Sequence, residues 1–281
     1  MAEDDFDLEK SAQRITKGAL RGLWDWLLGR SDGSESGPTP GRSILILGSN
    51  GTGKTTLARF LSGQLDWFDN EPDGYQESLG VERFALADDP GVELVVPPGQ
   101  DFRRPSTWPE LKARLAGGAF RGVVLVNAFG YHNFSTRSYT HHQLYAGSKA
   151  EFWDRYRADR RAEEVRILRE LAPHLATSAQ KLWLLSVVTK QDLWAGQQAA
   201  AEAHYLRGDY AAALDPVAGA VGGRNFRHEL VWASLVLRNL RTRDREPLAD
   251  TEAGYDISRQ AEALRGLYAA LSELRRWEGE Q

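Results

Sequence analysis

The chain has 281 residues, of which 42% are hydrophobic and 26% are charged, a composition typical of a folded globular protein. Its net charge of −4 lacks the basic excess of a general nucleic-acid binder, and the absence of cysteine excludes disulfides, thiolate nucleophiles and Cys-ligated zinc. Because no apolar run approaches the length of a membrane span and the chain starts with the acidic MAEDDFD, we expect a soluble, cytoplasmic protein.

The first thirty residues predict one amphipathic helix, because apolar residues recur at three- and four-residue steps. Those residues are Leu8, Ala12, Ile15, Ala19, Leu23 and Leu27. Residues 31–42 are rich in Gly, Ser and Pro and contain almost no apolar side chain, so we expect a flexible linker there. We expect the helix over 1–30 either to dock on the main domain or to bind a membrane surface or a protein partner. Its mixed charges weaken the membrane alternative.

From residue 43 to residue 281, short apolar runs alternate with helical patterns and form one expected domain. The runs predicted to be strands are SILILG (43–48), GVVLVNAF (122–129), KLWLLSVV (181–188) and ELVWASLVL (229–237). A further stretch, 81–96, predicts a hairpin that turns at Asp88-Asp89-Pro90-Gly91. One hairpin within a strand–helix alternation predicts an α/β fold with a mostly parallel sheet, one antiparallel edge strand and helices on both faces.

Two later segments are predicted to be helical. A closing helix is expected to begin near Asp256, with an inward stripe formed by Ile257, Ala261, Leu264, Tyr268, Leu271 and Leu274. Residues 151–176 predict a charged helix, in which acidic residues and arginines form a solvated, salt-bridged face. Residues 130–148 are expected to be a surface loop and a candidate partner contact, and we expect 130–176 together to be a helical insertion.

Residues 48–55, Gly-Ser-Asn-Gly-Thr-Gly-Lys-Thr, match the phosphate-binding loop pattern in full and follow a predicted buried strand. Glycines allow successive backbone N–H groups to face a phosphate, and the start of the next helix adds partial positive charge. Lys54 is expected to reach the β- and γ-phosphates and to take part in catalysis, and the Thr55 hydroxyl to bind Mg²⁺. The nucleotide contacts are predicted at Asn50, Gly51, Thr52, Gly53, Lys54, Thr55 and Thr56.

A second motif, Thr189-Lys190-Gln191-Asp192, follows the apolar strand that ends at residue 188. A carboxylate accepts two hydrogen bonds from the ring N–H and the exocyclic amine of guanine, whereas adenine offers no such donor pair. Asp192 is therefore predicted to select guanine over adenine. The stem of Lys190 is expected to cover one face of the base, and Thr189 to lie beside it. The alternative is that the aspartate caps a solvated helix.

With two further segments the sequence resembles the Ras superfamily of small GTPases. ESLGV (77–81) precedes the hairpin and VVPPGQDFRRP (95–105) ends it, and in the Arf-like branch, which looks closest, Thr-Ile-Gly precedes the hairpin while Gly-Gln-Asp and then Arg-Pro follow it. The resemblance covers most of 43–281 but not 130–165 or 195–225. It implies a P-loop GTPase-like three-layer sandwich that binds GTP or GDP with Mg²⁺.

The resemblance also implies roles for individual residues. Ser78 takes the place of the threonine that closes on Mg²⁺ and the γ-phosphate. The N–H of Gly99 would contact the γ-phosphate, and Gln100 would orient the attacking water as a catalytic residue. Ala233 and Ser234 would form the last loop that contacts guanine.

The sequence departs from the family at Val96, where the family carries an aspartate that holds Mg²⁺ through water. An alkyl group there is expected to weaken Mg²⁺ binding, and Pro97 and Pro98 are expected to stiffen a loop that moves between nucleotide states. We therefore expect slow hydrolysis unless a partner contributes an arginine.

The function that these patterns favour is a GTP-binding switch, read by a protein partner through the segments around Ser78 and Gln100. We expect no nucleic-acid partner. Two alternatives stay open at this stage. One is a nucleotide-binding scaffold that does not hydrolyse GTP, and the other is a P-loop ATPase or nucleoside kinase in which the motif at 189–192 is a coincidence.

Overall fold

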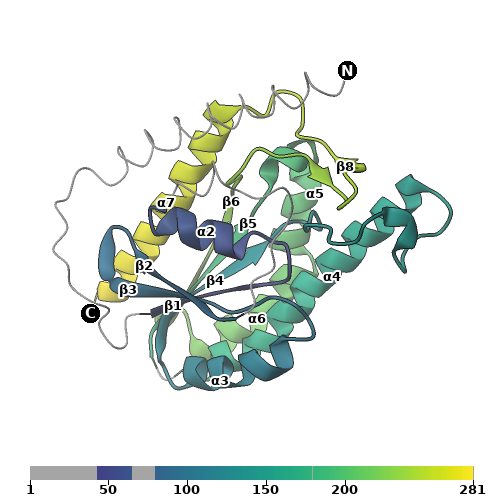
Figure 1. Ribbon diagram of the computed structural model, residues 1–281. Coiled ribbons are helices and arrows are strands. Elements are labelled where there is room, and N and C mark those ends of the chain that lie inside the picture. Colours follow the sequence, from purple (N-terminus) through teal and green to yellow (C-terminus); the bar gives the residue numbers. More distant parts are fainter. Residues whose placement is uncertain (1–42, 65–79, 179, 281) are drawn as a thin grey trace.

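The computed structural model describes residues 43–64, 80–178 and 180–280 (Figure 1). The predicted helix over 1–30, the linker over 31–42 and Ser78 lie outside the described residues. The strands are β1 (Ser43–Gly48), β2 (Glu82–Leu86), β3 (Asp89–Val96), β4 (Phe120–Asn127), β5 (Leu182–Val188), β6 (Phe226–Trp232), β7 (Leu240–Arg241) and β8 (Pro247–Ala249). The longer helices are α2 (Lys54–Leu61), α3 (Arg104–Ala116), α4 (Lys149–Ala176), α6 (Asp209–Val221) and α7 (Ile257–Gly279), and a short α5 (Gln198–Glu202) precedes α6.

Six strands form one sheet in the order β2-β3-β1-β4-β5-β6. β2 runs antiparallel to β3 at one edge, and the other neighbouring pairs are parallel. β1 and β5 are buried along their whole lengths, because helices cover both faces of a parallel sheet and leave no side of these strands to solvent. The predicted mostly parallel sheet with one antiparallel edge strand is confirmed. β7 and β8 pair separately as a small antiparallel ribbon.

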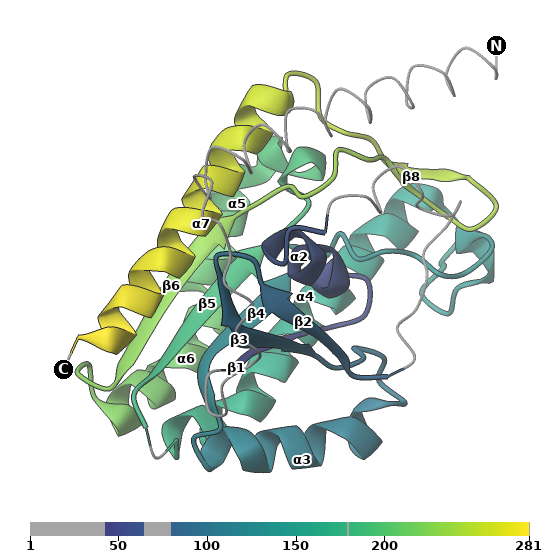
Figure 2. The same ribbon diagram turned by 60° about the vertical axis from the view of Figure 1, so that its left-hand side comes forward.

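Helices cover both faces of the sheet and produce three layers (Figures 1 and 2). α2 and α7 pack on one face, where Leu57 and Leu267 belong to one apolar cluster. α3, α4 and α6 pack on the other face and contribute Leu111, Leu168 and Val217 to a second cluster. The predicted three-layer α/β sandwich is confirmed. Within the described residues, no helix is both long enough and apolar enough to cross a bilayer.

Several predicted elements differ from the structure in their boundaries, among them β4, at 120–127 instead of 122–129. The last strand of the sheet occupies 226–232 instead of 229–237, because the chain leaves the sheet after residue 232 to enter the site described below. The hairpin turns at 87–88 rather than at 88–91, since Asp89 already belongs to β3.

The closing helix α7 begins at the predicted place. The side chain of Asp256 accepts a hydrogen bond from the N–H of Arg259 (3.0 Å), which caps the first turn. On the inward side of this helix Leu267 is buried where the sequence predicted Tyr268. Tyr268 is half-buried, and its hydroxyl donates to Asp88 (2.8 Å) on the hairpin.

The long charged helix α4 is part of the fold and not an insertion. β4 and β5 are parallel neighbours, and parallel strands require a crossover connection, which α4 supplies. The predicted solvated face is present at Arg155 and Glu151 (2.6 Å). Farther along the same helix, however, Glu163 and Glu164 are buried.

The segment before α4 is not wholly the surface loop that was predicted over 130–148. Tyr131, His132 and Phe134 are buried, and Tyr131 and Phe134 belong to the core cluster beneath α4. This part of the chain is held in place because it follows β4 directly and crosses the phosphate loop, as the next subsection describes.

Candidate nucleotide-binding site

Five loops meet where the parallel strands end at their carboxyl termini, the edge at which open α/β sheets bind ligands. Hydrogen bonds join neighbouring loops: the N–H of Thr189 donates to Asn127 (2.9 Å), and the N–H of Gln191 donates to Ala233 (3.1 Å). The loops are the phosphate loop after β1, residues 97–101 after β3, residues 128–134 after β4, residues 189–192 after β5 and residues 233–234 after β6.

The phosphate loop has the backbone conformation that a phosphate cradle needs. Gly48, Gly51 and Gly53 have φ values of 147°, 74° and 97°, which residues with a side chain rarely adopt. The first hydrogen bond of α2 runs from the N–H of Leu57 to the carbonyl of Gly53 (2.9 Å). The amides of residues 54–56, Thr56 included, therefore precede the helical ladder, and the partial positive charge of the helix start lies at the loop.

Lys54 is buried at the start of α2. Its Nζ donates to the carbonyl of Ser49 within the same loop (2.9 Å). Burial, with a smaller effect of the nearby Arg104, lowers the pKa of this lysine to about 7, and the carboxylates of Glu163 and Glu82 oppose the shift. A phosphate would supply the anion that stabilises the charged lysine in this position.

The loop that carries Gly99 and Gln100 lies against the phosphate loop. A Cβ added to Gly99 would lie 2.2 Å from Nζ of Lys54 and 2.8 Å from the carbonyl of Gly48, so only glycine allows this approach. The side chain of Gln100 is buried. The structure therefore brings Gly99 and Lys54 together, and Gln100 follows Gly99 in the same loop.

Arg104 anchors this loop, a role that sequence reasoning missed. Its Nε and Nη2 donate to the carbonyl of Gly99 (3.0 and 2.8 Å), and its guanidinium pairs with Asp101 (2.9 Å) and with the buried Glu163 of α4. The indole N–H of Trp108 in α3 donates to Pro98 (3.3 Å). The Arg-Pro pair of the sequence motif was the available signal, but Glu163, the buried partner of Arg104, lies 59 residues away in the chain.

The loop after β5 is tied to the phosphate loop. The hydroxyl of Thr189 lies 2.6 Å from the carbonyl of Thr52. Nζ of Lys190 donates to the carbonyl of Tyr131 and to Oδ1 of Asn133, each at 2.7 Å. The N–H of Asn133 in turn donates to Gly51 (3.0 Å). The segment after β4, to which the sequence analysis assigned no site residue, thus connects the two motifs.

Asp192 is fully buried. Its Oδ1 accepts from the hydroxyl of Ser234 (2.5 Å), and its Oδ2 accepts from the hydroxyl of Thr251 (3.2 Å) and the N–H of Arg238 (3.4 Å). Burial raises the pKa of this carboxyl to about 6, although these hydrogen bonds oppose the rise. The structure brings Asp192 after β5 and Ser234 after β6 together, and Ala233 directly precedes Ser234. Sequence reasoning missed Thr251.

The residues expected near Mg²⁺ are partly described. The hydroxyl of Thr55 donates to Oε2 of Glu82 at the start of β2 (2.8 Å), so hard oxygen ligands, the kind that Mg²⁺ prefers, do lie beside the phosphate loop. Val96 is buried and apolar. In the described part of the chain, no group of three or more His, Asp or Glu side chains could hold a metal ion, so a phosphate group would have to supply further ligands.

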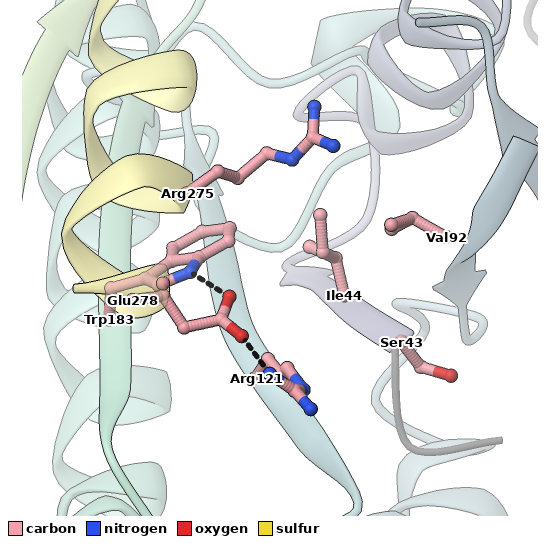
Figure 3. Close-up of a pocket in the computed structure, with 8 residues that line it drawn as sticks. Ser43, Ile44, Val92, Arg121, Trp183, Arg275 and Glu278 are labelled. Carbon is pink, nitrogen blue, oxygen red and sulfur yellow. Dashed lines mark hydrogen bonds and ion pairs between the residues drawn. The ribbon is translucent and has the colours of Figure 1, made fainter. Parts of the chain in front are cut away.

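A pocket of about 160 Å³ opens at the opposite edge of the sheet (Figure 3). Its lining includes Ser43 at the start of β1, together with Arg121, Trp183 and Glu278. Glu278 accepts hydrogen bonds from Nη1 of Arg121 (2.5 Å) and Nε1 of Trp183 (3.5 Å). Because it lies at the amino end of β1, this pocket is not part of the candidate site.

No protein-family model and no curated protein matches the sequence, but solved structures match. The signal recognition particle receptor SRb with GDP, from Chaetomium thermophilum, is 14% identical; the match covers 84% of this chain and 99% of that chain, with a TM-score of 0.38. The same receptor with GDP and Mg is 13% identical; that match covers 84% of this chain and 99% of that chain, with a TM-score of 0.36. The ADP-ribosylation-factor-like GTP-binding protein SAR1, the small COPII coat GTPase of Encephalitozoon cuniculi, in complex with GDP, is 13% identical, covering 97% of this chain and 93% of that chain, with a TM-score of 0.37.

The sheet order and the phosphate loop give this chain the fold of the P-loop GTPases, as its resemblance to the Ras superfamily predicted. The Arf-like branch is represented among the matched structures by SAR1. The likeness is one of fold, and the chemistry of the site depends on its own residues.

Proposed function

We propose that this chain is a guanine-nucleotide-binding switch protein that holds GTP or GDP with Mg²⁺ and hydrolyses GTP slowly. One observation carries the proposal: a lysine-bearing phosphate loop and a buried aspartate after β5 lie at the same sheet edge. Thr189 joins them, since its hydroxyl lies 2.6 Å from the carbonyl of Thr52 in the phosphate loop.

The phosphate end of the site would hold the charged part of the nucleotide. The glycine-rich backbone and the start of α2 favour an anion, and Lys54 would exchange the Ser49 carbonyl, 2.9 Å away, for a phosphate oxygen. Thr55 would hold Mg²⁺, which when bound neutralises charge on the terminal phosphates. The residues present fit such a group, because the loop offers donors for phosphate and a hydroxyl oxygen for the metal.

The base end of the site would select guanine through Asp192. Its carboxylate oxygens now accept hydrogen bonds from Ser234, Thr251 and Arg238, and the side chain has no exposed surface. A guanine base would therefore reach Asp192 only after displacing some of the surrounding side chains, Thr251 among them. Binding and opening of this loop would be coupled.

Slow hydrolysis follows from the loop that carries Gln100. The side chain of Gln100 is buried, and the Gly99 carbonyl beside it is held by two hydrogen bonds from Arg104. Orienting a water would require this loop to rearrange. Purified protein is expected to turn over far below about 1 s⁻¹, in the range of unassisted small GTPases.

A protein partner would read the nucleotide state next to these loops. Phe102 is 71% exposed two residues after Gln100, and Val81 is 40% exposed at the entry to the hairpin. In this proposal the partner would cover these two apolar side chains. A cytoplasmic location, with the helix over 1–30 on a membrane surface or on the partner, is part of the same proposal.

The test is a titration of nucleotide-stripped protein with fluorescent GDP, comparing wild type with Lys54→Ala and Asp192→Asn. We expect Lys54→Ala to weaken GDP binding at least tenfold, because it removes the charged donor. Asp192→Asn should weaken GDP binding about 100-fold and improve binding of xanthosine diphosphate, whose base carries a carbonyl that an asparagine amide can donate to.

Lys181→Ala is the matched control, since Nζ of Lys181 donates to Trp277 and Glu280 at the edge of the sheet opposite the site. GDP affinity unchanged by Lys54→Ala would contradict the proposal. If Asp192→Asn keeps the base preference of the wild type, Asp192 does not select the base, and the protein would belong to the ATPase or kinase class.

A second candidate is a nucleotide-binding scaffold without hydrolysis, favoured by the alkyl side chain of Val96, which is only 1% exposed. It predicts that GTP is retained without phosphate release and that Gln100→Leu changes nothing. If the wild-type protein releases phosphate and Gln100→Leu abolishes that release, the scaffold without hydrolysis is excluded.

A further inference from the structure

The end of β3 lacks an acidic side chain, but the strand beside it carries one. Val96 is buried and apolar, and the antiparallel register pairs it directly with Glu82 at the start of β2. Residues directly opposite in an antiparallel pair have side chains on the same face of the sheet. A carboxylate at position 82 therefore lies on the same face of the sheet as a side chain at position 96, and both can reach the same region.

Glu82 contacts the hydroxyl that is expected to bind the metal. Its Oε2 accepts a hydrogen bond from Oγ1 of Thr55 (2.8 Å), a contact between residues 27 apart in the chain. Thr55 follows Lys54 in the first turn of α2, and the field of Glu82 acts on Lys54 as well, since it raises the pKa of that lysine against the effect of burial. Glu82 therefore lies at the phosphate end of the site.

The contact between Glu82 and Thr55 has the chemistry of a magnesium site. A hydroxyl beside a carboxylate offers two hard oxygens of the kind that Mg²⁺ takes in phosphate-binding sites, and P-loop proteins hold the ion with such a pair. Two other carboxylates near this loop, Asp101 and Glu163, have a structural role instead, because both pair with Arg104. Among the described residues, Glu82 is thus a carboxylate that the fold brings to the hydroxyl of Thr55.

We propose that Glu82 is the acidic partner of the Mg²⁺ site and supplies from β2 the carboxylate that β3 lacks at Val96. This proposal rests on the proposed function, because the metal binds together with a nucleotide. Its consequence is that metal binding depends on the start of β2, so occupancy of the site would be coupled to the hairpin entry.

The experiment measures release of fluorescent GDP at increasing MgCl₂ and in EDTA. Wild type is compared with Glu82→Gln, which keeps the size of the side chain and removes its charge. Glu93→Gln is the matched control, because Glu93 lies on the same hairpin and pairs with Arg83. We expect the Mg²⁺ concentration that slows release by half to rise 10- to 100-fold in Glu82→Gln and to stay unchanged in Glu93→Gln.

A rescue separates metal binding from a merely structural contact. Glu82→Gln combined with Val96→Asp returns a carboxylate to the facing strand, and we expect it to recover most of the Mg²⁺ response. Glu82→Asp should recover part of it. Circular dichroism of each variant checks that the fold is intact.

GDP binding in EDTA reports the proposed function separately from the metal. If GDP binds and Glu82→Gln responds to Mg²⁺ like wild type, the assignment of Glu82 is wrong while nucleotide binding stands. If wild type binds GDP with no Mg²⁺ effect, the assignment is also wrong. If no GDP binds in either condition, both proposals fall.

Discussion

Glu164 is a carboxylate that the protein buries next to the candidate site. Its Oε1 accepts from the N–H of Ala128 (2.8 Å), and its Oε2 accepts from the hydroxyl of Tyr205 (2.5 Å). Burial raises its pKa from 4.5 to about 7, and both hydrogen bonds oppose the shift. A carboxyl whose pKa is higher in the folded than in the unfolded state holds its proton more tightly when folded.

The sign of the resulting pH dependence follows from linkage. Between about pH 4.5 and pH 7 the folded state binds more protons at Glu164 than the unfolded state does, so its contribution to stability falls as pH rises through this range. Glu164→Gln removes this titration. We expect wild type to lose more stability between pH 5 and pH 8 than the variant, by up to about 3 kcal/mol.

Urea unfolding of both proteins at pH 5 and pH 8 measures this difference, with Glu170→Gln as the control on the exposed side of α4. Parallel pH profiles for wild type and Glu164→Gln would show that Glu164 is already ionised at pH 5 in the folded protein, which would contradict a raised pKa.

At the scale of single elements, α3 and α4 are joined to the loop at 97–101 by one buried ion pair. The guanidinium of Arg104 and the carboxylate of Glu163 are 8% and 3% exposed, and Glu163 also pairs with Arg160. Removing the charge of Glu163 leaves the buried guanidinium of Arg104 with the mostly exposed Asp101 as its acidic partner, in a medium of low dielectric constant.

We therefore expect Glu163→Gln to lower the free energy of unfolding by about 3 kcal/mol. Glu170→Gln on the same helix breaks the partly exposed pair with Lys112 and should cost less than about 1 kcal/mol. Urea denaturation at pH 7 compares the two variants. Equal costs would mean that solvent screens the Arg104–Glu163 pair as effectively as the pair on the surface.

The elements differ in how far their sequences predict them. β1, the phosphate loop and β5 could be predicted, because each combines a continuous apolar run with a motif at its carboxyl end. α7 could be predicted from its period and from Asp256 at its start. The role of α4 was missed because a charged helix with few apolar positions resembles an insertion until the parallel pairing of β4 and β5 is known.

The residues of the candidate site also differ in how far the sequence predicts them. Lys54, Thr55 and Asp192 belong to local motifs and could be found from residue order alone. The contact of Glu82 with Thr55 and that of Arg104 with Glu163 span 27 and 59 residues. Such contacts depend on strand register and on helix packing, which no local pattern in one sequence specifies.

At the scale of the whole molecule, the parallel sheet brings the carboxyl ends of β1, β4, β5 and β6 to one edge. The phosphate loop and the loop of Asp192 are distant in sequence, yet Thr189 and Asn133 connect them through hydrogen bonds to Thr52 and Gly51. The two ends of a nucleotide would thus be bound by one hydrogen-bonded unit, and binding at either end would stabilise the other.

The most direct test of guanine-nucleotide binding is competition on the wild-type protein. Nucleotide-stripped protein is loaded with fluorescent GDP in MgCl₂, and unlabelled GDP or ADP is titrated in until the fluorophore is displaced. We predict displacement by GDP at concentrations at least 100-fold lower than by ADP, because only guanine offers Asp192 two donors. Equal displacement by ADP and GDP would contradict guanine selection by Asp192 and with it the proposed switch.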